Sequence, residues 1–291
     1  MASIDAVKAV SVITTGEAEG HYEHIFGTRK PDLWWIFFGR RWVRLPINVY
    51  VIEHQDGLVL FDTGQDPAVE TDADYWPDAV TAFFMRHIFR WHIGPEDSLS
   101  AQIERAGYAA TDVHKAVISH LHCDHVGGIA EIPQAELYTA EEGFAYMRGP
   151  DHPERHIVLR DRIEIPGAKW RMIPFEPTDD PAFAPFTEKF DVMGDGSLVV
   201  LPTPGHLAGA VSMLVRRGAA APLLLIGDLT YDEELLQRDQ FPAVGDKNLL
   251  TASFAKVRAL KKRMPDLVIL PAHDPRALEK LRAAAIEPFP P

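Results

Sequence analysis

The chain has 291 residues, 46% of them hydrophobic, so it is long enough to bury a large core. Its 29 Lys and Arg residues against 42 Asp and Glu residues give a net charge of −13, which argues against nucleic acid or an anionic membrane as the main partner. A single cysteine, an N-terminus without a signal-peptide pattern and no run near the ~20 apolar residues of a membrane helix together predict a cytoplasmic protein.

Apolar runs bounded by turn residues predict strands, and longer stretches with helical spacing predict helices. Residues 47–64 are expected to form a β-hairpin whose turn contains Asp56 and Gly57. The other expected elements are strands at 115–120, 197–206, 210–217, 222–229 and 266–274, a strand running into a helix at 135–147, and helices at 248–264 and 275–285. The Pro- and Asp-rich residues 174–185 are expected to form a surface loop. Strands that arrive in groups with helices between them predict a mixed α/β layered fold.

Two aromatic-rich segments stand apart from this pattern. The first, residues 33–42, reads "LWWIFFGRRW" and is too short to span a membrane. The second, residues 83–93, reads "FFMRHIFRWHI" and is expected to be an amphipathic helix with Arg and His on one side. Packing in the core or at a homodimer interface is the first interpretation of both segments, and an apolar wall over a binding site is the alternative.

The stretch "SHLHCDHVGG" concentrates metal-binding side chains directly after an apolar run. A lone histidine after a strand is usually a hydrogen-bonded core residue, but His120, His122, Asp124 and His125 fall within six positions. The two histidines at alternate positions of an extended backbone can point the same way, and the glycine pair 127–128 permits a tight start to a helix. The stretch therefore predicts a metal site.

Three further apolar runs end in residues of the same kind. The run "LVVLPTPGH" ends in His206, "LLLIGD" ends in Asp228, and "LVILPAHD" carries His273 near its end. Because sites in layered α/β folds assemble at strand ends, these residues are expected to join the first cluster.

In chain order, the segments "FDTG", "SHLHCDHVGG", "TPGH", "GD" and "PAHDP" resemble the motifs of the metallo-β-lactamase superfamily. The resemblance implies an αβ/βα four-layer sandwich, built from two ββα halves with a two-metal site between them, as one domain over residues 1–291. It also implies a set of ligands: His120, His122 and His206 on the first metal, Asp124, His125 and His273 on the second, and Asp228 bridging both. Asp62 would orient a ligand histidine.

A ligand set made only of nitrogen and oxygen suits two divalent metal ions, zinc first, with iron, cobalt or manganese as alternatives. In such a site the ions lie about 3.5–4 Å apart and share a water whose pKa falls to roughly 7, which supplies hydroxide at neutral pH. One ion can also polarise a substrate carbonyl. The implied enzyme is a hydrolase, with Asp124 counted among its catalytic residues.

The tyrosine in "GDLTY", Tyr231, distinguishes among hydrolases of the superfamily. Its spacing from Asp228 resembles that in N-acyl-homoserine lactonases, where a tyrosine contacts the lactone carbonyl or the leaving oxygen and can stabilise an oxyanion. The alternative is a tyrosine that only packs its ring. The resemblance implies a quorum-quenching enzyme that opens the lactone ring of a small-molecule substrate. The substrate's acyl tail would lie on the aromatic segments, through Trp34, Trp35, Phe37, Phe38, Phe83 and Phe84.

Other members of the superfamily remain alternatives. A glutathione thioesterase of the glyoxalase II kind would need a cationic patch, for which residues 261–263, "KKR", are the candidate. A phosphotriester hydrolase and a non-catalytic metal-binding module are further alternatives, the second disfavoured by the complete ligand set. The net charge of −13 disfavours a tRNA-processing nuclease.

The remaining chemistry-bearing residues are given structural roles. Cys123 lies inside the ligand motif and is expected to be a small buried side chain rather than a ligand. Most of the histidines outside the motifs are expected at the surface: His21, His24, His54, His87, His92, His114, His152 and His156. The loop that carries the last two could approach the site.

Overall fold

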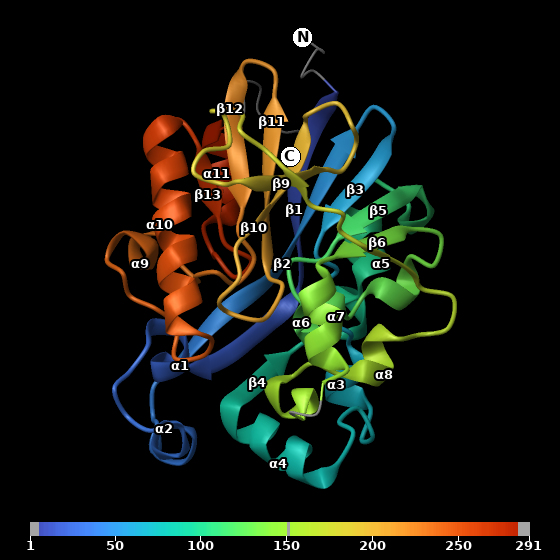
Figure 1. Ribbon diagram of the computed structural model, residues 1–291. Helices are drawn as coiled ribbons and strands as arrows, with labels where there is room; N and C mark the ends of the chain where they lie inside the picture. Colours follow the sequence, from blue (N-terminus) through green and yellow to red (C-terminus); the bar gives the residue numbers. More distant parts are fainter. Residues whose placement is uncertain (1–5, 150–151, 285–291) are drawn as a thin grey trace.

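The computed structural model describes residues 6–149 and 152–284. Two β-sheets pack face to face, and helices cover the outer side of each sheet (Figure 1). The predicted αβ/βα four-layer sandwich is therefore confirmed. Among the described residues, no helix combines the length and the apolar character needed to cross a membrane.

The first sheet has seven strands in the order β4-β1-β2-β3-β5-β6-β7. Their bounds are β1 Val7–His21, β2 Trp42–His54, β3 Gly57–Phe61, β4 Phe89–His92, β5 Val113–Val117, β6 Glu136–Thr139 and β7 Lys169–Met172. The predicted hairpin is confirmed as β2 and β3, which pair antiparallel up to His54 and Gly57. Strand β1 was not predicted, because a register shift between Thr14 and Glu17 interrupts its alternation of apolar and polar residues.

The second sheet has six strands in the order β13-β12-β11-β10-β9-β8. Their bounds are β8 Glu176–Pro177, β9 Glu188–Asp191, β10 Leu198–Pro202, β11 Val211–Arg217, β12 Ala220–Leu225 and β13 Val268–Leu270. Four of these strands were predicted, although β10, β12 and β13 end earlier and leave their terminal donors in loops. The prediction of a surface loop at 174–185 is wrong in part, since β8 forms there and Phe183 is buried against the second sheet.

The helices fill the outer layers and the ends of the sandwich. The α-helices are α1 Tyr22–Phe26, α2 Asp32–Phe38, α3 Ala68–Thr71, α4 Ala79–Ile88, α5 Leu99–Arg105, α6 Cys123–Val126, α7 Glu141–Met147, α8 Arg160–Ile163, α9 Glu233–Gln237, α10 Lys247–Arg263 and α11 Ala277–Ala284. The 3-10 turns are η1 Pro95–Asp97, η2 Ala110–Asp112, η3 Ile129–Glu131 and η4 Pro153–His156. Both predicted C-terminal helices are present as α10 and α11, and residue 285 of the second prediction lies outside the described residues.

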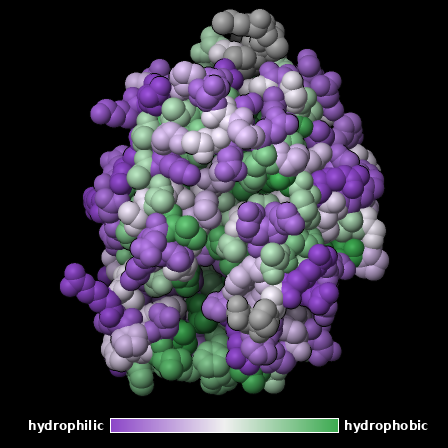
Figure 2. Space-filling view, in the orientation of Figure 1, coloured by the Kyte–Doolittle hydropathy of each residue, from purple (hydrophilic) through white to green (hydrophobic). Residues whose placement is uncertain are grey.

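The two aromatic segments form α2, α4 and β4 at one end of the molecule. Figure 2 shows hydrophobic residues gathered at the lower end of this face, where α2 and α4 lie. The predicted helix at 83–93 is wrong in its second half, because residues 89–92 form strand β4 and pair with β1. The alternation of half-buried Phe89 and Trp91 with exposed Arg90 and His92 fits a strand better than a helix.

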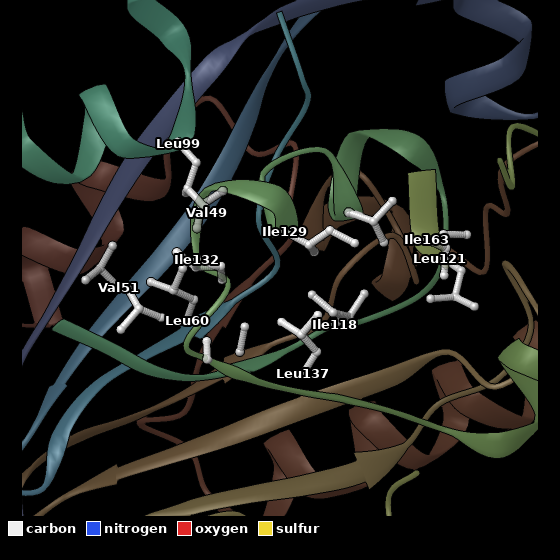
Figure 3. Close-up of a cluster of buried hydrophobic side chains, with 14 of the residues drawn as sticks. Val49, Val51, Leu60, Leu99, Ile118, Leu121, Ile129, Ile132, Leu137 and Ile163 are labelled. Carbon is white, nitrogen blue, oxygen red and sulfur yellow. The ribbon is translucent and has the colours of Figure 1, made fainter. Parts of the chain in front are cut away.

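The sheets are buried on both faces, and alternate residues of one strand serve different layers. In β3, Leu58 and Leu60 face the helices of the first half, in the cluster drawn in Figure 3. The intervening Val59 and Phe61 face the second sheet. This double burial holds the strands in place, so the loops at their ends have fixed starting points.

Candidate metal centre

The donors meet where strands of both sheets end. His120 and His122 follow β5, His206 follows β10, Asp228 follows β12, and His273 follows β13. Asp124 and His125 lie in α6, directly after the first pair. All seven predicted ligands are buried and form two groups whose donor atoms lie within 4.8 Å of one another: His120, His122, His206 and Asp228 in the first, and Asp124, His125 and His273 in the second.

The first group converges on the side chain of His122. Its Nδ1 lies 2.9 Å from Nε2 of His120 and 3.2 Å from Nε2 of His206. The expected reason for this convergence is wrong, because β5 ends at Val117 and His120 lies in a bend, not on an extended strand. The two side chains still converge, and the backbone of His122 is itself extended.

The glycine pair after the motif lies between two helical turns. Gly127 caps the end of α6, and Gly128 caps the start of the 3-10 turn η3, so the predicted entry into a helix is present as a 3-10 turn. A Cβ at Gly127 would lie 2.2 Å from the backbone nitrogen of Asp66, and one at Gly128 would lie 2.5 Å from the carbonyl oxygen of Thr63. The glycines therefore let the loop that follows β3 pack directly against the motif.

The carboxylate of Asp228 faces both groups. Its Oδ2 lies 3.6 Å from Nε2 of His206 in the first group. Its Oδ1 lies 3.4 Å from Nε2 of His125 and 3.2 Å from Nε2 of His273 in the second. This is the arrangement that a bridging ligand requires.

Burial sets the charge of the first group. It lowers the pKa of His120 and His122 well below the ordinary histidine value, and it lowers the pKa of His206 in the same direction. These imidazoles are therefore neutral at pH 7, and each keeps a nitrogen lone pair for a ligand.

Carboxylates dominate the second group. Burial alone would lower the pKa of His125, but Asp62, Asp228 and Asp124 outweigh burial and raise it well above its ordinary value. The pKa of His273 is raised in the same way, chiefly by Asp228. The negative field that raises both pKa values also favours a bound cation.

Asp62 orients the motif from the loop after β3. Its backbone is left-handed, with a φ of 66°, which turns the carboxylate towards residues 119–125. The carboxylate accepts hydrogen bonds from the Ser119 backbone N–H at 2.6 Å, the Ser119 hydroxyl at 2.9 Å and His125 Nδ1 at 2.9 Å. Because Nδ1 of His125 is held in this way, its Nε2 faces the donors of the second group, as the sequence predicted for Asp62.

The donors fit divalent cations. Oδ1 of Asp124, Nε2 of His125 and Oδ1 of Asp228 are buried and have no hydrogen-bond partner in the protein. Each such atom costs about 1–3 kcal/mol unless a ligand satisfies it. Two nitrogens on one tetrahedral zinc ion lie about 3.3 Å apart, close to the spacing around His122 Nδ1. A nitrogen and oxygen set with these spacings can hold zinc or a similar ion.

Cys123 contributes no donor to either group. It is fully buried, its sulfur accepts a hydrogen bond from Nε2 of Gln65 at 3.2 Å, and burial raises the pKa of its thiol. The side chain packs in an apolar cluster with Tyr75 and Ile157. This environment matches the expected role as a small buried side chain.

A cavity of about 570 Å³ opens above the donors. Its floor contains His122, Asp124, His206, Asp228 and His273. Its wall is mainly apolar, and the contributing residues are Ile25, Trp35, Ile36, Leu45, Met85, Ile88, Phe89, Ile157, Leu207, Val244 and Leu249. The pocket thus joins a polar, metal-binding floor to an apolar wall.

The aromatic wall predicted from the sequence is only partly correct. Trp35 is buried and lines the pocket. Phe38, on the same helix, is 65% exposed and is absent from the lining, as are Phe37 and Phe83. Helix α2 therefore presents one aromatic face to the pocket and another to solvent.

Tyr231 lies in the pocket beside the donors. Burial raises the pKa of its hydroxyl well above the ordinary value, and the charge of Asp228 raises it further. The phenol therefore keeps its proton and can donate a hydrogen bond. Its ring lies beside His273, with the ring centroids 5.6 Å apart.

His24, in α1, is a pocket residue that the sequence did not reveal. Its Nε2 lies 3.5 Å from the Tyr231 hydroxyl, its Nδ1 is buried without a partner, and burial lowers its pKa to about 3. The expectation that most of the remaining histidines are exposed fails for His21, His24 and His54, which are buried. His21 bonds the His87 carbonyl and His54 bonds Asp195, partners too distant in sequence for a local pattern to indicate.

The loop that carries His152 and His156 does approach the site. His156 and Arg155 line the pocket, whereas His152 is exposed and forms an ion pair with Glu154. Arg155 is the only Lys or Arg residue among the described residues of the lining. The pocket is therefore poor in positive side chains.

Comparison with known proteins agrees with this geometry. The profile of the metallo-beta-lactamase superfamily matches residues 42–273. The N-acyl homoserine lactonase AttM of Rhizobium johnstonii is 29% identical over 243 residues, which cover 82% of this chain and 86% of the relative. A probable metallo-hydrolase of Mycobacterium tuberculosis is 31% identical over 261 residues, covering 84% of this chain and 79% of its own.

Among solved structures, an N-acyl homoserine lactone hydrolase with N-hexanoyl-L-homoserine at its catalytic metal centre superposes with a TM-score of 0.75. The alignment covers 98% of this chain and all of that chain at 19% identity, so what the two share is the fold. The chain belongs to the metallo-beta-lactamase superfamily.

Proposed function

We propose that the protein is a single-domain, metal-dependent hydrolase that opens the lactone ring of N-acyl-homoserine lactones, and thus a quorum-quenching enzyme. The observation that carries the proposal is the pocket, whose floor of metal donors adjoins an apolar wall. Such a substrate has a polar ring to meet the floor and an acyl tail to meet the wall. The relatives named as lactonases, which match most of the chain, support the same assignment.

The donor groups would hold two divalent ions, zinc in the first instance. His120, His122 and His206 would hold one ion, Asp124, His125 and His273 the other, and Asp228 would contact both. When bound, such ions supply hydroxide at neutral pH and withdraw charge from a carbonyl. The single cysteine is buried and unpaired, which supports a cytoplasmic location.

The protein's own residues would bind and orient the lactone. The Tyr231 hydroxyl, which stays protonated, can donate a hydrogen bond to the carbonyl oxygen as charge develops on it, or to the leaving ring oxygen. Asp124 lies at the pocket floor beside the other donors, so its carboxylate can accept a proton from the attacking water and return it to the leaving ring oxygen. Trp35 and Met85 would bind the tail and exclude water.

A glutathione thioesterase fits this pocket less well. Glutathione carries two carboxylates, and Arg155 is the only Lys or Arg residue that the described lining offers. The candidate cationic patch at 261–263 lies in the last turn of α10, whereas Leu249 of the lining lies in its first turn. That separation is about 18 Å along the helix axis, because each residue advances about 1.5 Å.

A substrate panel tests the proposal. Purified protein of measured metal content would be assayed with an N-acyl-homoserine lactone, a glutathione thioester, a β-lactam and a phosphotriester under the same conditions. We expect the lactone to have the highest kcat/KM. A higher kcat/KM for the thioester or the phosphotriester would overturn the assignment within the superfamily.

A further inference from the structure

One end of the molecule exposes an unusual number of large apolar side chains. We name this region the α2–α4 surface and define it by six residues: Leu33, Trp34, Phe37 and Phe38 of α2, and Val80 and Phe83 of α4. The exposed fraction of each lies between 41% and 65%. The two helices contact each other through Phe37 and Phe83, whose ring centroids lie 6.2 Å apart. Figure 2 shows hydrophobic residues gathered at the end of the molecule where these helices lie.

This surface lies in a strongly basic part of an acidic protein. Residues 22–44 and 79–92 contain seven Lys or Arg residues and two Asp or Glu residues, a net charge of 7 − 2 = +5. The rest of the chain then carries −13 − 5 = −18. The seven cations are all exposed: Arg29, Lys30, Arg40, Arg41, Arg44, Arg86 and Arg90.

Only part of this positive charge is neutralised locally. Lys30 pairs with Glu23, Arg44 with Glu17, and Arg90 with Glu19. Arg29, Arg40 and Arg86 form no ion pair with any described residue. The net charge of −13 for the whole chain argues against an anionic membrane as a partner. This part of the surface nevertheless carries a local excess of positive charge.

The surface adjoins the pocket. Trp35 and Ile36 of α2 line the pocket, as do Met85 and Ile88 of α4, so the same two helices separate the apolar wall from solvent. A molecule that contacts the outer side of these helices would lie next to the pocket. The two helices thus contact the pocket on one side and solvent on the other.

We propose that the α2–α4 surface binds peripherally to an anionic lipid bilayer. Exposed Trp, Phe and Leu side chains flanked by Arg and Lys are the composition with which amphipathic segments enter the headgroup region. The apolar residues lie at the boundary of the acyl chains, and the unpaired arginines contact lipid phosphates. A second copy of the chain fits less well, because an isologous contact would bring the unpaired arginines of two copies together. The binding does not depend on the proposed lactonase activity.

Vesicle sedimentation tests this binding on the purified, metal-loaded protein. We expect the protein to sediment with vesicles of phosphatidylcholine containing about 40% phosphatidylglycerol at about 50 mM salt, and to remain in solution with phosphatidylcholine alone. Binding should weaken at about 500 mM salt, where charges are screened beyond a few ångströms. The tryptophan fluorescence of the protein should shift to the blue on binding, and Trp34→Phe should reduce this shift.

Two double variants separate the contributions. Leu33→Ser with Phe38→Ser removes apolar contacts, and Arg29→Gln with Arg40→Gln removes cations that have no ion pair. Each cation near an anionic surface strengthens binding by about fivefold, so the second variant should bind on the order of 20-fold more weakly. Matched controls are Leu278→Ser and Lys262→Gln, exposed positions on α11 and α10 that should leave binding unchanged.

Light scattering of the same proteins without vesicles tests the alternative that the α2–α4 surface binds a second copy of the chain. The proposal predicts that the wild type and Leu33→Ser/Phe38→Ser have the same molar mass. A wild-type dimer that becomes a monomer in this variant would overturn the proposal and make the surface a subunit interface. Absence of binding to anionic vesicles at low salt, or binding that both double variants retain, would also overturn it. An unchanged circular dichroism spectrum and an unchanged melting temperature show that a variant is folded, whether or not the protein hydrolyses lactones.

Discussion

The floor and the wall of the pocket are built in different ways. The floor takes its donors from the ends of β5, β10, β12 and β13, strands buried on both faces. The wall takes its side chains chiefly from the short helices α1, α2 and α4, from β4 and from the start of α10. Donors that must hold atoms within tenths of an ångström thus lie in short segments that follow strands of the rigid sheets, whereas the surface that selects a substrate comes from peripheral elements. This difference predicts that changes to the floor abolish the reaction and that changes to the wall alter its selectivity.

The largest effect is expected from the centre of the floor. His122→Ala removes the imidazole that lies nearest to both His120 and His206, so the protein should lose one or both ions and nearly all activity. Metal analysis and lactone turnover on the same sample provide the measurement. The control is His114→Ala, which changes an exposed histidine outside both donor groups and should keep the ions and the activity. A variant at His122 with full activity would contradict the ligand assignment.

A residue that only orients the floor should have a smaller effect. Asp62→Asn keeps the shape of the side chain but weakens its hydrogen bonds to Ser119 and to Nδ1 of His125. Loss of such a partner costs on the order of 10–100-fold in metal affinity or activity. Competition with a chelator of known affinity measures the change directly. Unchanged metal affinity would show that the remaining contacts hold His125 without this carboxylate.

Tyr231 lies between the floor and the wall of the pocket, and an intermediate effect is expected from removing its hydroxyl. Tyr231→Phe keeps the ring and removes the hydroxyl, and we expect turnover to fall by about 10²-fold or less because the ions share the stabilisation of the oxyanion. Steady-state kinetics at verified metal content separate kcat from KM. The control is Tyr108→Phe, which removes a hydroxyl that donates a hydrogen bond to Glu53. Tyr108 does not line the pocket, so this variant should leave turnover unchanged. If Tyr231→Phe behaves like this control, Tyr231 is a packing residue.

The smallest effect is expected in the wall. Each buried CH₂ contributes about 0.8 kcal/mol, so two more carbons on the acyl tail should improve kcat/KM by roughly tenfold until the tail leaves the pocket. Trp35→Ala should flatten this rise while sparing a lactone without a tail. Phe38→Ala, on the exposed side of the same helix, should preserve it. An equal slope in wild type and Trp35→Ala would place the tail elsewhere.

The sequence predicts the floor far better than the wall, for a physical reason. Polar residues directly after apolar runs are costly to bury, so His206, Asp228 and His273 are conspicuous in the sequence, and the sandwich brings the ends of their strands together. His24 carries no such signal. Its helix has five residues, and the rings packed against it include those of Phe89 and of Tyr231, which lies 207 positions away in the chain.

Local patterns also fail where a short segment satisfies two periodicities. Residues 83–93 alternate and also repeat at helical spacing, and only the pairing of β4 with β1 ends the helix at Ile88. Helix α2 shows the same limit in another form. Its aromatic content predicts an apolar surface, but which of Trp35 and Phe38 faces the pocket follows from packing against distant parts of the chain.

The central claim is that the two donor groups of this chain support lactone hydrolysis. The most direct measurement is mass spectrometry of an N-acyl-homoserine lactone incubated with the protein, combined with metal analysis of the same batch. We predict close to two divalent ions per chain and a ring-opened product heavier than the substrate by one water, with neither result in His122→Ala. Protein that holds its ions and leaves the lactone intact would contradict the account.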